Sequence, residues 1–196
     1  MTTPVLDPCC GPKMMWFDKD DDRVTFGDIR EESTELCDGR ILTVSPDVVL
    51  DFRALPFPDD TFWHVVFDPP HLKSLGKKSW TAAKYGALLP TWHEDIAEGL
   101  SECFRVLKPH GTLIFKWNEQ QIPTARIIEI IGQKPLFGHT SGKGGKTPRV
   151  GRHVGLRLLK MLRKAERRAG PGPVRRDRQI RPAPGKPLRD CGKGHC

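Results

Sequence analysis

The chain has 196 residues, which suits one domain with an appended segment, and its hydrophobic fraction of 37% is low but sufficient for one core. No apolar run approaches the ~20 residues of a membrane span, and the N-terminus has no basic-then-apolar signal pattern, so we expect no membrane association. Six scattered cysteines without a repeated C-x-x-C spacing favour reduced thiols over a disulfide framework, which predicts a cytoplasmic protein.

The formal net charge of +8 hides a marked asymmetry along the chain. Residues 143–196 contain 17 Lys and Arg against 3 Asp and Glu, whereas residues 1–142 contain 15 against 21. An acidic body followed by a basic end indicates either a polyanionic partner or a solvated end that has none. We expect a folded domain over residues 1–147 and a basic tail, rich in Pro, Gly and Arg, over residues 148–196.

Short apolar segments that carry an aspartate at or near their end recur through the first third of the chain. They are residues 4–7, 24–28, 47–52 and 65–68, with Asp7, Asp28, Asp51 and Asp68 as the aspartates. Strands that alternate with helices predict a parallel α/β sheet, whose ligands bind beyond the carboxyl ends of the strands. The four carboxylates are therefore expected to lie along one edge of that sheet.

The second half of the domain alternates helix and strand. Trp92 to Leu107 has apolar residues at spacings of 4, 4, 4 and 3, which predicts an amphipathic helix that ends at Lys108-Pro109-His110-Gly111. Thr112 to Trp117 predicts a fifth strand, Ile122 to Ile131 a helix, and Lys134 to Thr140 a sixth strand.

The turn Asp68-Pro69-Pro70-His71 stops the fourth strand abruptly. Two prolines fix φ and supply no N–H, so they lock the turn and leave backbone carbonyls free. Asp68 and the Pro69 carbonyl could each accept one hydrogen of a planar NH2 group, and His71 could lie flat against an aromatic base. A plain strand-terminating turn is the alternative.

Asp-Pro-Pro-His resembles the (Asp/Asn/Ser)-Pro-Pro-aromatic motif of S-adenosylmethionine (SAM) methyltransferases that modify amino groups. His71 stands where that family has Tyr, Phe or Trp. Two longer segments, residues 55–66 and 105–115, resemble the connections before the fourth and fifth strands of class I methyltransferases. Over residues 4–140 the resemblance implies a Rossmann-like class I sheet, mostly parallel, with SAM as cofactor and an atypical basic C-terminal tail.

The same resemblance implies where the cofactor would bind. The loop after the first strand would wrap the methionine moiety, and the acid that ends the second strand would hold the ribose hydroxyls, with Asp18 as a second choice. An acid and an aromatic residue after the third strand would contact the adenine. The implied residues are Asp7, Cys9, Gly11, Asp28, Asp51 and Phe52. A very short helix would follow over Lys13 to Phe17. We expect Cys9 to be a packing residue rather than a nucleophile.

Lys73 to Thr91 is long for a loop and has no clear periodicity. Its interleaved cations and aromatic rings suit a nucleic-acid strand or a flipped base. The candidate substrate contacts are Lys73, Lys77, Lys78, Trp80 and Tyr85. A surface loop whose aromatic side chains fold back onto the body is the alternative.

Beyond Thr147 the sequence departs from the family, which closes with a seventh strand antiparallel to the others. Val154 to Ala169 predicts a basic amphipathic helix, and Gly170 to Cys196 predicts disorder. A grafted arm or a shifted reading frame would then replace the strand. We expect neither nucleotide hydrolysis, because residues 142–147 fail the phosphate-loop pattern, nor a bound metal.

The sequence therefore predicts a SAM-dependent methyltransferase that modifies an exocyclic amino nitrogen of a nucleic-acid base. The sequence resembles small phage and prophage methyltransferases, which favours adenine N6 in DNA over a target in RNA. The same resemblance implies that the protein works in a bacterial or phage-infected cytoplasm. Methylation of guanine N2 in RNA or of a protein glutamine stays open, because all these targets share a planar NH2. A non-catalytic nucleic-acid-binding protein acting through its tail is the alternative from another class. The oligomeric state is unknown from the sequence.

Overall fold

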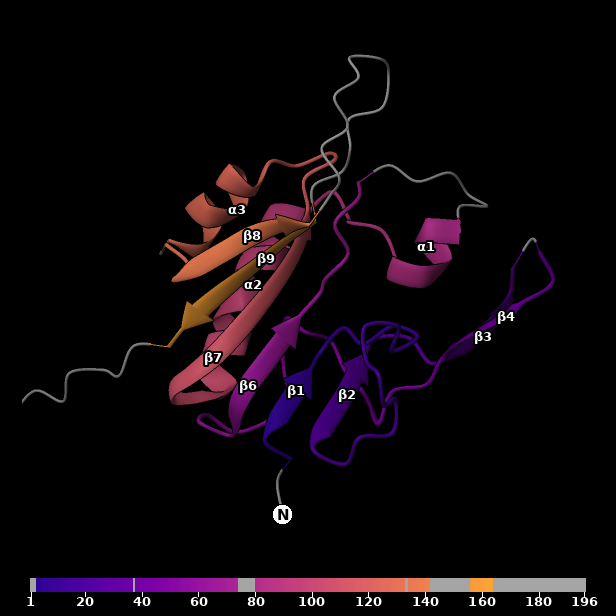
Figure 1. Ribbon diagram of the computed structural model, residues 1–196, viewed down its shortest axis with the longest axis horizontal. Coiled ribbons are helices and arrows are strands. Elements are labelled where there is room, and N and C mark those ends of the chain that lie inside the picture. The colour runs from indigo at the N-terminus through magenta and orange to yellow at the C-terminus, as the bar shows by residue number, and fades with distance from the viewer. Residues whose placement is uncertain (1–2, 37, 74–79, 133, 142–155, 164–196) are drawn as a thin grey trace, which may run out of the picture. The chain divides into compact units, whose positions relative to one another are not determined.

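A seven-stranded sheet forms the centre of the computed structural model, which describes residues 3–36, 38–73, 80–132, 134–141 and 156–163. The strands are β1 (Val5–Asp7), β2 (Val24–Asp28), β5 (Val48–Val49), β6 (Phe62–Phe67), β7 (Leu107–Asn118), β8 (Phe137–Ser141) and β9 (Leu156–Leu162). They lie in the order β5-β2-β1-β6-β7-β9-β8, and Figure 1 shows this order from β2 to β8. Neighbouring strands from β5 to β7 pair in parallel, and β9 pairs antiparallel with both β7 and β8.

This arrangement confirms the predicted fold class, a mostly parallel Rossmann-like sheet. The chain builds outward from β1 to β2 and β5, then returns to the other side of β1 to build β6 and β7. Loops that leave the carboxyl ends of β1 and β6 therefore diverge, and a crevice opens where the strand order reverses. This switch point is the place in such a sheet where a ligand is expected.

The predicted basic helix over Val154 to Ala169 is wrong, because Leu156–Leu162 forms strand β9. Its pairing with β7 runs from Thr112↔Leu162 to Asn118↔Leu156. Leu159 and Met161 are buried in the core while Lys160 between them is half-buried, which is the alternation of a strand. The folded domain thus extends beyond the predicted boundary at residue 147. Residues 142–155 and 164–196, with the predicted disorder and the tail cysteines, lie outside the described residues.

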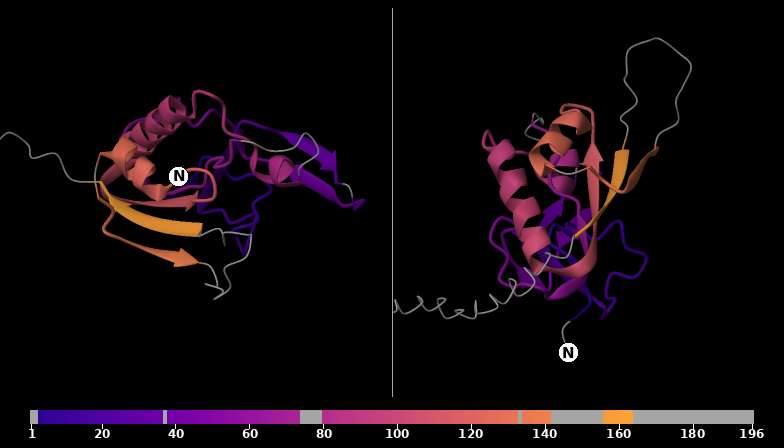
Figure 2. Two further views of the ribbon diagram at one scale, coloured as in Figure 1. Left: turned by 90° about the horizontal axis from the view of Figure 1, so that it is seen from above. Right: turned by 90° about the vertical axis from the view of Figure 1, so that its left-hand side faces the viewer.

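Two helices cover one face of the sheet (Figure 2). α2 (Trp92–Val106) confirms the predicted amphipathic helix, and α3 (Thr124–Ile131) confirms the helix predicted over Ile122 to Ile131. Alternate residues of β7 point toward them: Leu113, Phe115 and Trp117 are buried in one core cluster with apolar residues of both helices. The intervening residues of β7, among them Lys116, therefore point to the opposite face.

A loop covers part of that opposite face, where a short helix over Lys13 to Phe17 was predicted. The helix does not form; the segment makes turns, with positive φ at Gly11 and Lys13. Trp16 packs edge-on against Phe26 of β2, with ring centroids 5.2 Å apart. This small second cluster takes the place of a helix beside β1 and β2.

The sequence did not indicate two further elements. A hairpin of β3 (Glu32–Glu35) and β4 (Ile41–Val44) follows β2 and projects away from the sheet in Figure 1. All four residues of β3 are exposed, so the strand lacks the apolar alternation that would reveal it. The short helix α1 (Trp80–Tyr85) lies within the long loop after β6. No helix in the described ranges is long and apolar enough to cross a membrane.

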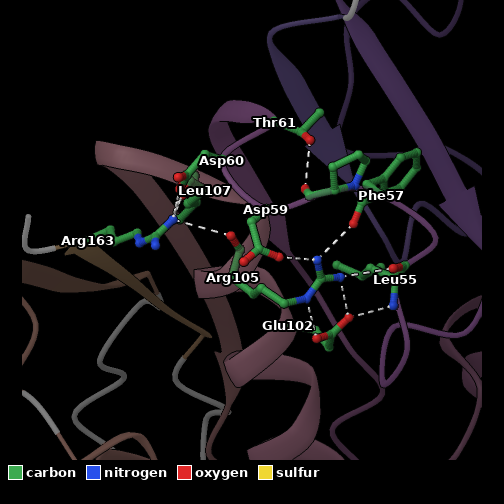
Figure 3. Close-up of polar contacts among 10 residues, drawn as sticks. Leu55, Phe57, Asp59, Asp60, Thr61, Glu102, Arg105, Leu107 and Arg163 are labelled. Carbon is green, nitrogen blue, oxygen red and sulfur yellow. Dashed lines mark hydrogen bonds and ion pairs between the residues drawn. The ribbon is translucent and has the colours of Figure 1, made fainter. Parts of the chain in front are cut away.

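An arginine near the end of α2 organises the amino-terminal edge of the sheet (Figure 3). Arg105 donates to Glu102 and to Asp59, the latter at 2.8 Å. It also donates to the backbone carbonyls of Phe57 at 2.8 Å and Leu55 at 3.0 Å. Both terminal nitrogens of this guanidinium thus hold the loop before β6 against α2, while its Nε bonds to Glu102 within the helix.

A second arginine attaches the end of β9 to the same edge. Arg163 pairs with Asp60 and donates to the carbonyls of Leu107 and Arg105, the latter at 3.2 Å (Figure 3). Its backbone N–H also donates to the Gly111 carbonyl at 3.1 Å. These bonds satisfy carbonyls at the end of α2 and hold the antiparallel strand in register.

Candidate active site

A cavity of about 460 Å³ opens at the carboxyl edge of the sheet, at the switch point between β1 and β6. Its size falls within the roughly 300–1,000 Å³ common for small-molecule sites. All six residues predicted to bind the cofactor line it: Asp7, Cys9, Gly11, Asp28, Asp51 and Phe52. Asp68, Pro70, Tyr85 and Lys116 line it too. The fold therefore gathers residues that lie more than a hundred positions apart in the chain.

Asp7 at the end of β1 is buried and holds the following loop. Its Oδ1 accepts the N–H of Cys9 at 3.1 Å, and its Oδ2 accepts the indole N–H of Trp16 at 2.7 Å. Burial raises the pKa of Asp7 to about 7, although both hydrogen bonds oppose the rise. Sequence reasoning missed Trp16, because an aromatic residue in a turn-rich loop carries no signal of its partner.

Gly11 occupies a place that few other residues could take. Its φ is +50°, and a Cβ built on it would lie 3.2 Å from the carbonyl oxygen of Lys84 in α1. Its N–H donates to Oδ2 of Asp28 at 2.9 Å. The glycine thus lets three segments of the cavity wall approach closely.

Asp28 and Asp51 each pair with the arginine two residues later. Oδ1 of Asp28 accepts the backbone N–H of Arg30 at 3.0 Å and its Nε–H at 3.2 Å. The Arg53 guanidinium contacts both oxygens of Asp51 and holds the pKa of that carboxyl below its usual range. Each carboxylate oxygen can accept more than one hydrogen bond, so these pairs leave capacity for a ligand hydroxyl or amine.

The two arginines connect the strand ends to helices beside the cavity. Arg30 donates to the carbonyl of Ala83 at 2.9 Å and that of Lys84 at 3.4 Å, both near the end of α1. Arg53 donates to Asp95, in the first turn of α2, at 2.9 Å. Sequence reasoning missed both arginines, although the repeated spacing Asp-x-Arg, also present at 21/23 and 38/40, is a usable signal.

Asp68 presents one paired and one unpaired carboxylate oxygen. Oδ2 pairs with Nζ of Lys116 on β7, whereas the buried Oδ1 has no hydrogen-bond partner among the described residues. Burial raises the pKa of Asp68, and Lys116 opposes the rise. Sequence reasoning missed Lys116; a lysine near the carboxyl end of an otherwise apolar strand is the signal that could have found it.

His71, which was predicted to stack on a base, lies outside the lining of the cavity. It is only 5% exposed, and its ring packs between Tyr85 at 5.6 Å and Trp117 at 6.2 Å. Burial lowers the pKa of His71, so the ring is neutral near pH 7. Neither His71 nor Pro69 is among the cavity-lining residues, while Pro70 and Tyr85 are. Tyr85, which was predicted to contact the substrate, therefore places an aromatic residue in the cavity wall.

The other predicted substrate residues lie outside this cavity or outside the description. Lys73 places its ammonium 4.5 Å from the ring centroid of Trp92, away from the cavity lining. Lys77, Lys78 and the side chain of Trp80 fall outside the described residues. Asp18, the second choice for the ribose, accepts an N–H of its own exposed loop and does not line the cavity.

Two cysteine thiols line the cavity. Burial raises the pKa of Cys9 well above its usual value and that of Cys10 to about 12. Both therefore stay protonated at neutral pH, which disfavours a thiolate nucleophile and agrees with a packing role. Within the described ranges, no group of three His, Cys, Asp or Glu side chains is placed to hold a metal ion.

No protein-family model matches the chain, and no curated protein is similar in sequence. Among solved structures, a SAM-dependent methyltransferase from Methanosarcina mazei is 12% identical, with a TM-score of 0.49 over 83% of this chain and 92% of that chain. A SAM-dependent methyltransferase from Leishmania major is 15% identical, with a TM-score of 0.46 over 82% and 64%. The cyclase SpnF is 14% identical, with a TM-score of 0.48 over 83% and 74%. At such identities, activity has to be argued from the site itself.

Proposed function

We propose that the chain is a SAM-dependent methyltransferase that modifies an exocyclic amino nitrogen. The observation that carries this proposal is Oδ1 of Asp68, a buried acceptor at the cavity without a partner among the described residues. Buried polar atoms are almost always hydrogen-bonded, so an unpaired one beside a cavity indicates a donor on a ligand. An amino group is a donor of this kind.

The residues of the cavity fit SAM as the cofactor. Asp28 would accept the ribose hydroxyls, Asp51 the adenine amine, and Phe52 would pack against the adenine ring. Gly11 would let the backbone approach the methionine moiety closely. When bound, SAM supplies an activated methyl group on a positively charged sulfur, which suits a cavity lined by several carboxylates.

The chain's own contribution is to orient the amine and take up its proton. Asp68 accepts a hydrogen of the amine, which favours the pyramidal nitrogen of the transition state over the flat, conjugated one. Bound SAM would supply the methyl group: the nitrogen would bond to the methyl carbon as the sulfur–carbon bond breaks, and a neutral thioether would leave. The proton that the nitrogen must lose passes to Oδ1 of Asp68. Raised by burial, the pKa of this carboxyl suits a proton acceptor.

The favoured substrate is adenine N6 in DNA. Tyr85 offers an aromatic face beside Asp68, which suits a base taken out of its stack. The basic end of the sequence suits a polyanion. RNA guanine N2 and protein glutamine carry the same planar NH2, and we treat them as outcomes of the test.

Calorimetric titration of SAM into the full chain, compared with Asp28→Ala, tests the cofactor site. We expect binding that weakens in the variant. Transfer of labelled methyl from SAM is then measured on DNA, RNA and a glutamine peptide, with Asp20→Ala in an exposed loop as the control. A folded chain that binds DNA but neither SAM nor its methyl-depleted product would instead support the non-catalytic alternative and overturn the proposal.

A further inference from the structure

We propose that Lys116 is a positioning residue, which keeps Asp68 ionised and leaves its Oδ1 facing the cavity. The inference rests on the proposed function, because it assigns the group that prepares Asp68 to accept a hydrogen from the substrate amine. Three features of the structure carry it: the register of two strands, the burial of the pair, and the unequal use of the two carboxylate oxygens.

Strand register brings the two side chains together. β6 and β7 pair in parallel with Phe67 opposite Phe115, so the next residue of each strand, Asp68 and Lys116, reaches the same level of the sheet. Both phenylalanines point into the core beneath the helices. Asp68 and Lys116 therefore project to the opposite face, at the carboxyl edge that forms the cavity.

The pair is shielded from solvent on both sides. The side chain of Asp68 is 9% exposed and that of Lys116 is 13% exposed. The Lys116 ammonium also lies 5.6 Å from the ring centroid of Tyr85, which lines the same cavity. A cation held over one aromatic ring and against one carboxylate has little freedom to move away.

The two carboxylate oxygens of Asp68 have different partners, which distinguishes a functional Asp68–Lys116 pair from a purely structural one. Lys116 contacts Oδ2, and Oδ1 is left as a buried acceptor without a partner among the described residues. A buried ion pair that served stability alone would be expected to satisfy both oxygens, because an unmet buried acceptor costs free energy. This arrangement instead keeps one anionic acceptor available at the cavity.

Other titratable groups around Asp68 cannot keep it ionised without Lys116. Burial raises the pKa of Asp68, Lys116 gives the largest opposing effect, and His71 gives a smaller one. The charge of Asp68 in turn raises the pKa of Asp7 and of the Cys9 thiol, from β1 and the loop after it, so neither group stabilises a charged Asp68. Without the lysine, Asp68 would hold a proton at higher pH and would donate where the amine requires an acceptor.

The decisive measurement is a carbon-13 NMR titration of the aspartate carboxyl groups in the full chain, without cofactor. The Asp68 signal is assigned with Asp68→Asn. We expect its titration midpoint to rise in Lys116→Met and to return toward the wild-type value in Lys116→Arg. Lys160→Met is the matched control: it removes a lysine from the adjacent strand β9, where the ammonium lies over Phe137 rather than near Asp68.

The pH profile of methyl transfer is the second readout. In Lys116→Met, kcat near pH 7 should fall roughly 10- to 100-fold, the scale of one charge-assisted hydrogen bond, and the acidic limb should move to higher pH. An unchanged Asp68 midpoint in a folded Lys116→Met chain would overturn the inference. A raised midpoint supports it, even if the wild-type chain transfers no methyl group, in which case only the proposed function fails.

Discussion

At the amino-terminal edge of the sheet, the Arg105 guanidinium donates to two carboxylates and two backbone carbonyls, and Arg163 closes the same network. At the carboxyl-terminal edge, Asp28, Asp51 and Asp68 are also paired with cations, but they line a cavity, and Oδ1 of Asp68 is unpaired among the described residues. Pairs of a carboxylate with a cation therefore fix loops and a helix end at the amino-terminal edge. At the carboxyl-terminal edge, pairs of the same kind leave carboxylate oxygens facing a cavity. The two edges differ in whether the ion pairs leave a buried carboxylate oxygen without a hydrogen-bond partner among the described residues.

The largest expected effect comes from removing the acceptor at the carboxyl edge. Asp68→Asn should reduce methyl transfer by on the order of 1,000-fold, because the amide cannot take up a proton and keeps only one acceptor oxygen. Calorimetry should show SAM binding within a few-fold of wild type. If binding and transfer were lost together in a folded chain, Asp68 would be a cofactor ligand instead.

A pH dependence of stability should come from Asp7. Its pKa is about 7 in the folded chain and about 4 in the unfolded chain, so the folded state holds the proton to higher pH. The free energy of unfolding should therefore fall as the pH rises from about 4 to 7, by on the order of a few kcal/mol, and then level off.

Urea unfolding at pH 5 and pH 7.5 measures this decline. In Asp7→Asn the decline should be smaller, since residue 7 no longer ionises. A wild-type chain as stable at pH 7.5 as at pH 5, with Asp7→Asn showing the same profile, would contradict the assignment.

Breaking the Arg105 network at the amino-terminal edge should lower the stability of the fold and leave cofactor binding at the cavity unchanged. Arg105→Met removes several hydrogen bonds from partly buried carbonyls and carboxylates, so we expect a loss of about 2 kcal/mol in the free energy of unfolding. Chemical denaturation measures the loss, and SAM affinity below the transition should match wild type. A change in affinity would show that the two edges are coupled.

The Asp-x-Arg pair inside the cavity should differ from the same pair outside it. Arg30→Met loosens α1 from the end of β2, and we expect SAM affinity to fall about tenfold, the scale of one hydrogen bond to a charged group. Arg23→Met breaks the exposed pair with Asp21 at the same spacing and is the control. Equal affinities in the two variants would remove Arg30 from the site.

The smallest effect should come from Arg163, which attaches the end of β9. Arg163→Met should cost about 1 kcal/mol in the free energy of unfolding, because the Arg105 and Leu107 carbonyls lose one donor. Hydrogen exchange should show faster exchange at the β7–β9 pairing than at β1–β6. Uniform protection across the sheet would mean that Arg163 does not hold the strand.

Local patterns in the sequence determined the parallel sheet, the two covering helices and the edge on which four aspartates meet. The spacing of apolar residues, proline turns and acids at strand ends are all properties of residues close together in the chain. The bounds of β2 and α2 agree closely with the elements that these patterns predict. Only the tertiary structure decided that Leu156–Leu162 is a strand, because its apolar spacing also fits a helix and pairing with β7 selects between the two. The tertiary structure alone also decided that Lys116 lines the cavity and that His71 does not. Whether a side chain reaches a cavity or packs beneath it depends on strand register and burial, which link residues far apart in the chain.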